Sequence, residues 1–102
     1  MFFFIFIILI FGLLDRAFTR RSCTVELQDK ILVGFADEVF KKVGFKECKA
    51  KCSKSSHCKS GLYFKDDKEC ILNRETRHSQ SSLFIDSDPE KDGKVVYFEC
   101  KN

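Results

Sequence analysis

The chain has 102 residues, six cysteines and a formal net charge of +3. Residues 1–22 hold three of the 18 basic residues and one of the 15 acidic residues, so the rest of the chain carries a net charge of only +1. A charge this small predicts no particular partner, and the remaining length of about 80 residues suits one domain with a core that is marginal without cross-links.

The N-terminal segment predicts an export signal. Residues 1–14 contain no charged side chain and are rich in Phe, Ile and Leu. Because a membrane-spanning helix needs roughly 17–25 apolar residues, we expect a secretory signal peptide over residues 1–22, cut between residues 17 and 22. Ala17 and Ser22 are the plausible last residues of this leader. Three arginines after the apolar run depart from the usual signal pattern, so a retained membrane anchor is the alternative.

The next part of the chain predicts strands and turns. Thr24–Leu27 alternates polar and apolar side chains, the period-two pattern of a half-buried strand. A polar turn follows, and Ile31–Val33 then forms a short apolar strand that ends at Gly34. Residues 39–43 keep a β-type composition around two lysines.

A helix is predicted over Gly44–Ser53. Phe45, Cys48 and Cys52 recur at intervals of three and four residues, while lysines occupy other positions. Gly44 is a suitable N-cap. Because the two cysteines are four residues apart, both project from the same face of this helix.

A β-hairpin is predicted after the helix. From Cys58 the sequence indicates a strand, an acidic turn at Asp66 and Asp67, and a return strand with Cys70 near its start. Asp66 and Asp67 could also be read as an acid/base or calcium pair, but acidic residues are common in such turns.

The last part of the chain predicts loops and one strand. Asn73–Ser82 is polar and is expected to be the longest and most mobile loop. After the apolar run Leu83–Ile85, Asp86–Gly93 turns, and its Asp86 and Asp88 are interpreted as turn formers. Lys94–Cys100 is predicted to be the last strand.

The six cysteines all follow the predicted leader. An even number in a short exported chain predicts a disulfide framework in an oxidising compartment. A rival hypothesis makes Cys48, Cys52, Cys58 and His57 zinc ligands. We expect no metal, because exported thiols oxidise and zinc fingers use paired C-x2-4-C units. His57 is expected on the surface of the turn after the helix.

The cysteine spacing, with the residues beside it, resembles the PAN/apple family of secreted binding modules. The resemblance covers Cys23–Cys100 and rests on the following pattern: Cys23, then Cys48-x3-Cys52-x5-Cys58, then Cys70-Ile-Leu, then Tyr97-Phe98-Glu99-Cys100. It implies an α+β fold for residues 23–102, in which one α-helix packs on an antiparallel β-sheet in a small disulfide-stapled domain.

The resemblance also implies a disulfide pairing and a function. Six cysteines allow many pairings, and the family pattern implies Cys23–Cys100, Cys48–Cys70 and Cys52–Cys58. It further implies a secreted, non-enzymatic module without a cofactor, which recognises an extracellular protein or carbohydrate.

A strongly basic segment, residues 41–59, is the candidate ligand-binding surface. It contains only one acid, Glu47, and seven lysines, which we call the basic stripe: Lys41, Lys42, Lys46, Lys49, Lys51, Lys54 and Lys59. Such a stripe predicts attraction of a sulfated glycosaminoglycan or an acidic protein surface. The alternative is a solvated helix face that only keeps the protein soluble. Export disfavours nucleic acid, and a membrane is a partner only if the N-terminal segment is retained.

No catalytic motif is present in the sequence. The chain lacks a G-x-S-x-G elbow, an H-E-x-x-H pair and a Gly-rich phosphate loop, so we do not expect an enzyme. A small disulfide-rich inhibitor or toxin-like protein is a further alternative, because such scaffolds serve many roles. Nothing in the sequence marks the rigid exposed loop that an inhibitor would need.

Overall fold

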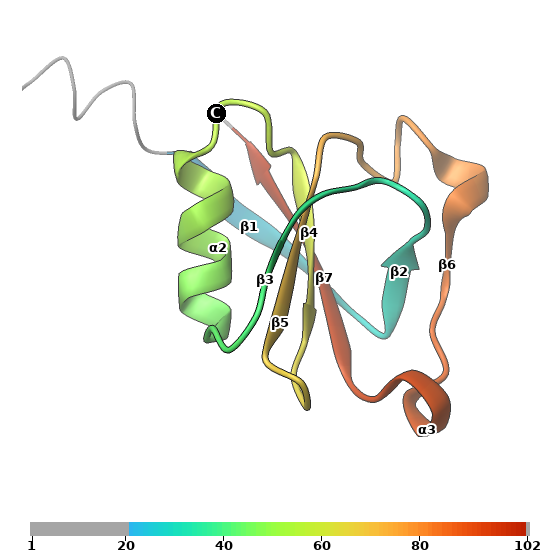
Figure 1. Cartoon of the computed structure of the whole chain (residues 1–102). Helices are drawn as coiled ribbons and strands as arrows, with labels where there is room; N and C mark the ends of the chain where they lie inside the picture. The colour runs from blue at the N-terminus through green and yellow to red at the C-terminus, as the bar shows by residue number, and fades with distance from the viewer. Residues whose placement is uncertain (1–20, 102) are drawn as a thin grey trace, which may run out of the picture.

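The computed structural model describes residues 21–101, so the predicted leader lies outside the described residues apart from Arg21 and Ser22. The fold is the expected small α+β domain, with one main helix on a five-stranded antiparallel sheet and three disulfides (Figure 1). Its elements in chain order are β1 (Ser22–Gln28), β2 (Lys30–Leu32), β3 (Ala36–Phe40), α2 (Phe45–Lys54), β4 (Ser60–Phe64), β5 (Glu69–Asn73), the 3-10 turn η1 (Ser81–Leu83), β6 (Phe84–Asp86), α3 (Pro89–Asp92) and β7 (Val95–Lys101).

The main sheet has the strand order β1-β7-β4-β5-β3, and every neighbouring pair is antiparallel. Helix α2 lies on one side of this sheet, and the two-stranded pair β2–β6 lies on the other (Figure 1). Strand β7 therefore has a neighbour on each edge and a covered surface on each face. This is why all six residues of Val95–Cys100 are buried, including the polar Glu99.

Two apolar clusters fill the spaces on either side of the sheet. The cluster under α2 combines disulfide sulfurs with Tyr63, Leu72 and Phe98. The cluster under β2–β6 is built around Leu32 and Tyr97. The alternation of strand side chains assigns Phe98 to the first cluster and Tyr97 to the second.

The predicted helix and its N-cap are confirmed. Helix α2 follows Gly44, which has extended backbone angles and makes no side-chain cap hydrogen bond. Cys48 and Cys52 are fully buried, as expected for one helix face directed at the sheet. Glu47 in the first turn and Lys51 and Lys54 in the last turn match the helix dipole.

The predicted hairpin is confirmed, but the boundary of the loop after it is wrong. Asn73 is the last residue of β5 and is buried, whereas the sequence assigned it to the loop. The rest of the loop is also tied to the sheet, because the amide of Arg77 donates to the hydroxyl of Tyr97 at 3.0 Å. The polar composition of the loop predicted mobility because it does not reveal this contact with Tyr97, which is distant in sequence.

Gly61 packs directly beneath an aromatic ring. It lies opposite Phe98 in the β4–β7 pairing, and a Cβ at this position would come within 2.2 Å of the ring. We expect Gly61→Ala to lower the free energy of unfolding by about 1–3 kcal/mol, because the fully buried ring has to shift. Urea denaturation followed by circular dichroism measures this loss. Gly44→Ser is the control, since a Cβ there meets open space and the hydroxyl adds a helix cap.

Candidate functional site

Three disulfides connect the helix, the sheet and the chain ends. The bonds are Cys23–Cys100, Cys48–Cys70 and Cys52–Cys58, the same pairs that the family resemblance implies. Cys48 joins α2 to β5, while Cys52 joins the same helix face to the segment before β4. All six sulfurs are bonded in these three pairs, so Cys48, Cys52 and Cys58 are not thiolate ligands and the zinc hypothesis is wrong. Such disulfides indicate an oxidising environment.

The seven lysines of the basic stripe divide into two groups. Lys49 and Lys51 are half-buried, whereas five are exposed: Lys41, Lys42, Lys46, Lys54 and Lys59. The exposed lysines lie on α2 and on the connections at its two ends. Of the five, Lys46 and Lys54 lie on α2 itself, and Lys41, Lys42 and Lys59 lie on the connections.

The half-buried lysines contact neighbouring side chains. The Lys49 ammonium pairs with the Glu26 carboxylate at 2.8 Å and lies 4.5 Å from the centre of the Phe45 ring. The Lys51 ammonium lies 4.4 Å from the centre of the Phe40 ring. These contacts help to hold α2 against β1 and β3, so these two lysines have a structural role that the exposed lysines do not share.

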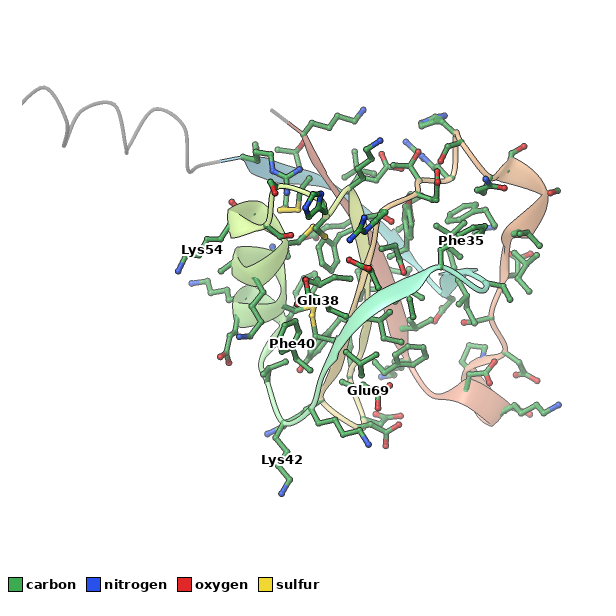
Figure 2. The ribbon with its side chains drawn as sticks, turned by 45° about the horizontal axis from the view of Figure 1, so that its top comes forward. Phe35, Glu38, Phe40, Lys42, Lys54 and Glu69 are labelled. Carbon is green, nitrogen blue, oxygen red and sulfur yellow. A yellow bond between two sulfur atoms is a disulfide. The ribbon has the colours of Figure 1, made fainter. Side chains whose placement is uncertain are left out.

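The exposed lysines form an elongated surface. Lys54 projects outward from the C-terminal end of α2, and Lys42 projects outward from the connection between β3 and α2, beyond the other end of the helix (Figure 2). A helix of ten residues is about 15 Å long, which exceeds the Debye length of about 8 Å at physiological ionic strength. A small anion therefore feels only one end of this surface, whereas an extended polyanion can contact both.

Asp66 and Asp67 lie in the hairpin turn, as predicted. Asp86, in contrast, is the last residue of β6 and pairs with Lys30, so its assignment to a turn is wrong. The Asp88 carboxylate accepts a hydrogen bond from the Glu90 amide at 3.0 Å and caps the short helix α3. The Asp66 carboxylate lies against Gly93, where an added Cβ would come within 2.6 Å of it. Within residues 21–101, no group of three or more His, Cys, Asp or Glu side chains is arranged to hold a metal ion.

A buried polar cluster is the feature that sequence reasoning missed. The Glu99 side chain is fully buried and accepts from the Tyr97 hydroxyl at 2.7 Å and from Arg77 Nε at 3.1 Å. Beside it, Asn73 donates to the Ser60 hydroxyl at 3.3 Å, and that hydroxyl donates to the carbonyl of the loop residue Glu75. A single acidic residue, Glu99, within the otherwise apolar run of β7 is the sequence signal for this cluster.

Tyr97 connects this cluster to the loop. Burial raises the pKa of its hydroxyl, and the hydrogen bond to the Glu99 carboxylate raises that pKa further. The hydroxyl therefore stays protonated and donates to Glu99 while it accepts from the Arg77 amide. The cluster is a structural anchor for the loop, not an exposed binding surface.

The β4–β5 hairpin is partly internal. Tyr63 is buried, and its hydroxyl donates to the carbonyl of Val43 at 2.7 Å. This bond fixes the connection between β3 and α2. Only the tip of the hairpin, residues 65–68, is exposed.

Of the four exposed large apolar side chains in the described part of the chain, three lie on the opposite side of the molecule from α2, and the fourth, Val39, lies on β3. Val33 is 43% exposed, Leu83 39% and Ile85 48%, and all three belong to the β2–β6 pair or flank it. The amide of Val33 donates to the carbonyl of Leu83, so these side chains are neighbours. The molecule thus has a basic helix side and a partly apolar β2–β6 side.

Comparisons with known proteins agree with this geometry. Residues 23–101 match the family model of the PAN domain. An uncharacterized protein of Caenorhabditis elegans is 38% identical over 78 residues, a match that covers 70% of this chain and 12% of that protein. Among the described residues, no helix is long and apolar enough to span a membrane. The chain therefore belongs to the PAN domain family, whose domains are typically non-catalytic modules that bind proteins or carbohydrates.

Proposed function

We propose that this protein is a secreted, non-enzymatic binding module, and that the exposed lysines along α2 recognise a sulfated glycosaminoglycan. The observation that carries this proposal is the division of the basic stripe. Five lysines are exposed on α2 and on the connections at its ends, while the two that have structural contacts are half-buried. Exposed like charges spaced over the length of a helix favour an extended polyanion.

The competing explanation is that these lysines only keep the domain soluble or complement the helix dipole. Lys51 and Lys54 do lie in the last turn of α2, where positive charge is stabilising. The dipole gives no such reason for Lys42, which precedes the helix, or for Lys46, which lies in its first turn. Positive charge at the N-terminal end opposes the dipole, so these two lysines favour a role in binding.

Elution from a heparin column tests the proposal. We expect Lys42→Gln/Lys46→Gln/Lys54→Gln to elute at a clearly lower salt concentration than the unaltered protein, because each lost contact with an anionic group removes a counterion-release contribution. Lys49 and Lys51 are left in place, since their replacement would also disturb packing.

The matched control removes the same charge elsewhere. Lys65, Lys91 and Lys94 are exposed and lie on the hairpin tip, on α3 and beside β7. Replacing all three by Gln should leave elution nearly unchanged. Equal shifts for the two triple variants would show that overall charge, not the helix surface, causes retention.

A protein ligand is the second candidate, and the exposed Val33, Leu83 and Ile85 favour it. Ile85→Lys introduces a charge into this apolar surface without touching α2. Binding of an extracellular protein that is lost in Ile85→Lys, but retained in the lysine variant, would support this candidate over the glycosaminoglycan.

A further inference from the structure

Arg21 lies just before the first strand and contacts the far end of the helix. Its guanidinium donates to the carbonyl of Cys52 at 2.6 Å and also to the carbonyl of Ser55. In return, the Ser53 hydroxyl donates to the carbonyl of Arg21 at 2.8 Å. The start of β1 is thereby attached to the C-terminal end of α2 (Figure 1).

These contacts are made to carbonyls at the end of the helix, where the Cys52 carbonyl accepts from the Ser55 amide as well. The last carbonyls of an α-helix have no partner within the helix, and a positive charge there also complements the dipole. Arg21 is half-buried in this position, and the same helix end carries the Cys52–Cys58 disulfide. Arg21 therefore acts as a helix cap supplied from outside α2.

We propose that Arg21 is an integral residue of the folded domain, and that removal of the leader occurs N-terminal to it. Of the two plausible leader ends, cleavage after Ser22 would remove Arg21 and also the first residue of β1, which pairs with Lys101. Cleavage after Ala17 retains both residues. In that hydrolysis by signal peptidase, water adds a hydroxyl to the Ala17 carbonyl carbon and a proton to the Phe18 nitrogen.

This inference extends beyond the family match. The match begins at residue 23, so it does not include Arg21. The contacts of Arg21 make the structural domain longer at its N-terminus than the family pattern indicates. The proposal concerns processing and is independent of which ligand the domain binds.

The first test is the N-terminus of the protein produced from the full chain in a secreting eukaryotic cell. Intact mass and N-terminal sequencing should give a first residue between Phe18 and Arg21, whereas an uncut chain would contradict the proposed removal of the leader. A protein that begins at Ser22 or Cys23 would overturn the proposal.

The second test is thermal unfolding of Arg21→Ala, with Ser22→Ala as the control at an exposed neighbour. We expect Arg21→Ala to lower the Tm by roughly 4–8 °C, and Ser22→Ala to leave it nearly unchanged. Equal Tm values for Arg21→Ala and the unaltered protein would contradict a capping role.

Limited trypsin digestion of the unaltered protein adds a readout that needs no variant. The bond after Arg21 should be cut far more slowly in the folded protein than after reduction and denaturation. Rapid cutting at Arg21 in the folded protein would show that its contacts do not hold it, and would count against the proposal.

Discussion

Replacing Cys23 and Cys100 together by alanine should cause the largest loss of stability among the three disulfide variants. On the loop-entropy model, a cross-link that spans this separation of 77 residues contributes about 4–5 kcal/mol to the free energy of unfolding. The Cys48–Cys70 and Cys52–Cys58 bonds close shorter loops, with separations of 22 and 6 residues, and contribute about 3 and about 2 kcal/mol. The ranking follows because a disulfide that closes a longer loop removes more conformational entropy from the unfolded chain.

Urea denaturation of the three double-alanine variants, followed by circular dichroism, measures this ranking. Each variant removes both partners, so no free thiol is left to form a wrong bond. Cys48, Cys70 and Cys52 are fully buried, so their loss adds a packing term that brings both shorter-loop variants closer to the first. The prediction would be contradicted if the Cys52–Cys58 variant were the least stable. That result would show that local contacts at the end of α2 matter more than the length of the closed loop.

Arg77→Ala should produce the second large effect. The Glu99 side chain is fully buried, while that of Arg77 is 30% exposed, and they meet at 3.1 Å. Within residues 21–101, Glu99 Oε1 has no hydrogen-bond partner, so the carboxylate depends on Arg77 and Tyr97. Removing Arg77 leaves a buried charge without its counterion, and we expect a loss of about 3–5 kcal/mol.

A surface pair supplies the control for this prediction. Arg74 pairs with Asp37 at 3.1 Å, but its side chain is 59% exposed, so Arg74→Ala should cost only about 0–1 kcal/mol. Adding Glu99→Gln to Arg77→Ala should recover part of the stability, because the uncompensated charge is removed. Chemical denaturation of the single and double variants measures both effects. Similar losses for Arg77→Ala and Arg74→Ala would show that burial of Glu99 gives the pair no special importance.

The elements with local patterns could be predicted from the sequence. The spacing of Phe45, Cys48 and Cys52 fixed the face of α2, and the alternation after Cys23 predicted β1. The exposed side of the helix followed from the same periodicity, which is why Lys46 and Lys54 could be placed in advance. The structural roles of Lys49 and Lys51 could not be predicted, because their contacts are with residues of β1 and β3.

The features that depend on distant pairing could not be predicted. Strand β7 lies between β1 and β4, and nothing in its own sequence specifies those neighbours. The loop residue Arg77 and the strand residue Glu99 meet only because β5 and β7 both pair with β4. The polar composition of residues 74–82 consequently predicted a mobile loop. The residue that holds this loop, Tyr97, belongs to β7 and is distant in sequence.

The central claim is that the exposed lysines along α2 form the ligand-binding surface. Titration of the ¹⁵N-labelled domain with a short heparin oligosaccharide, followed by two-dimensional NMR, tests it most directly. We expect the shifted amide signals to belong to residues 41–59, with those of β2 and β6 unchanged. Shifts confined to β2 and β6, or an absence of shifts at low salt, would contradict the claim.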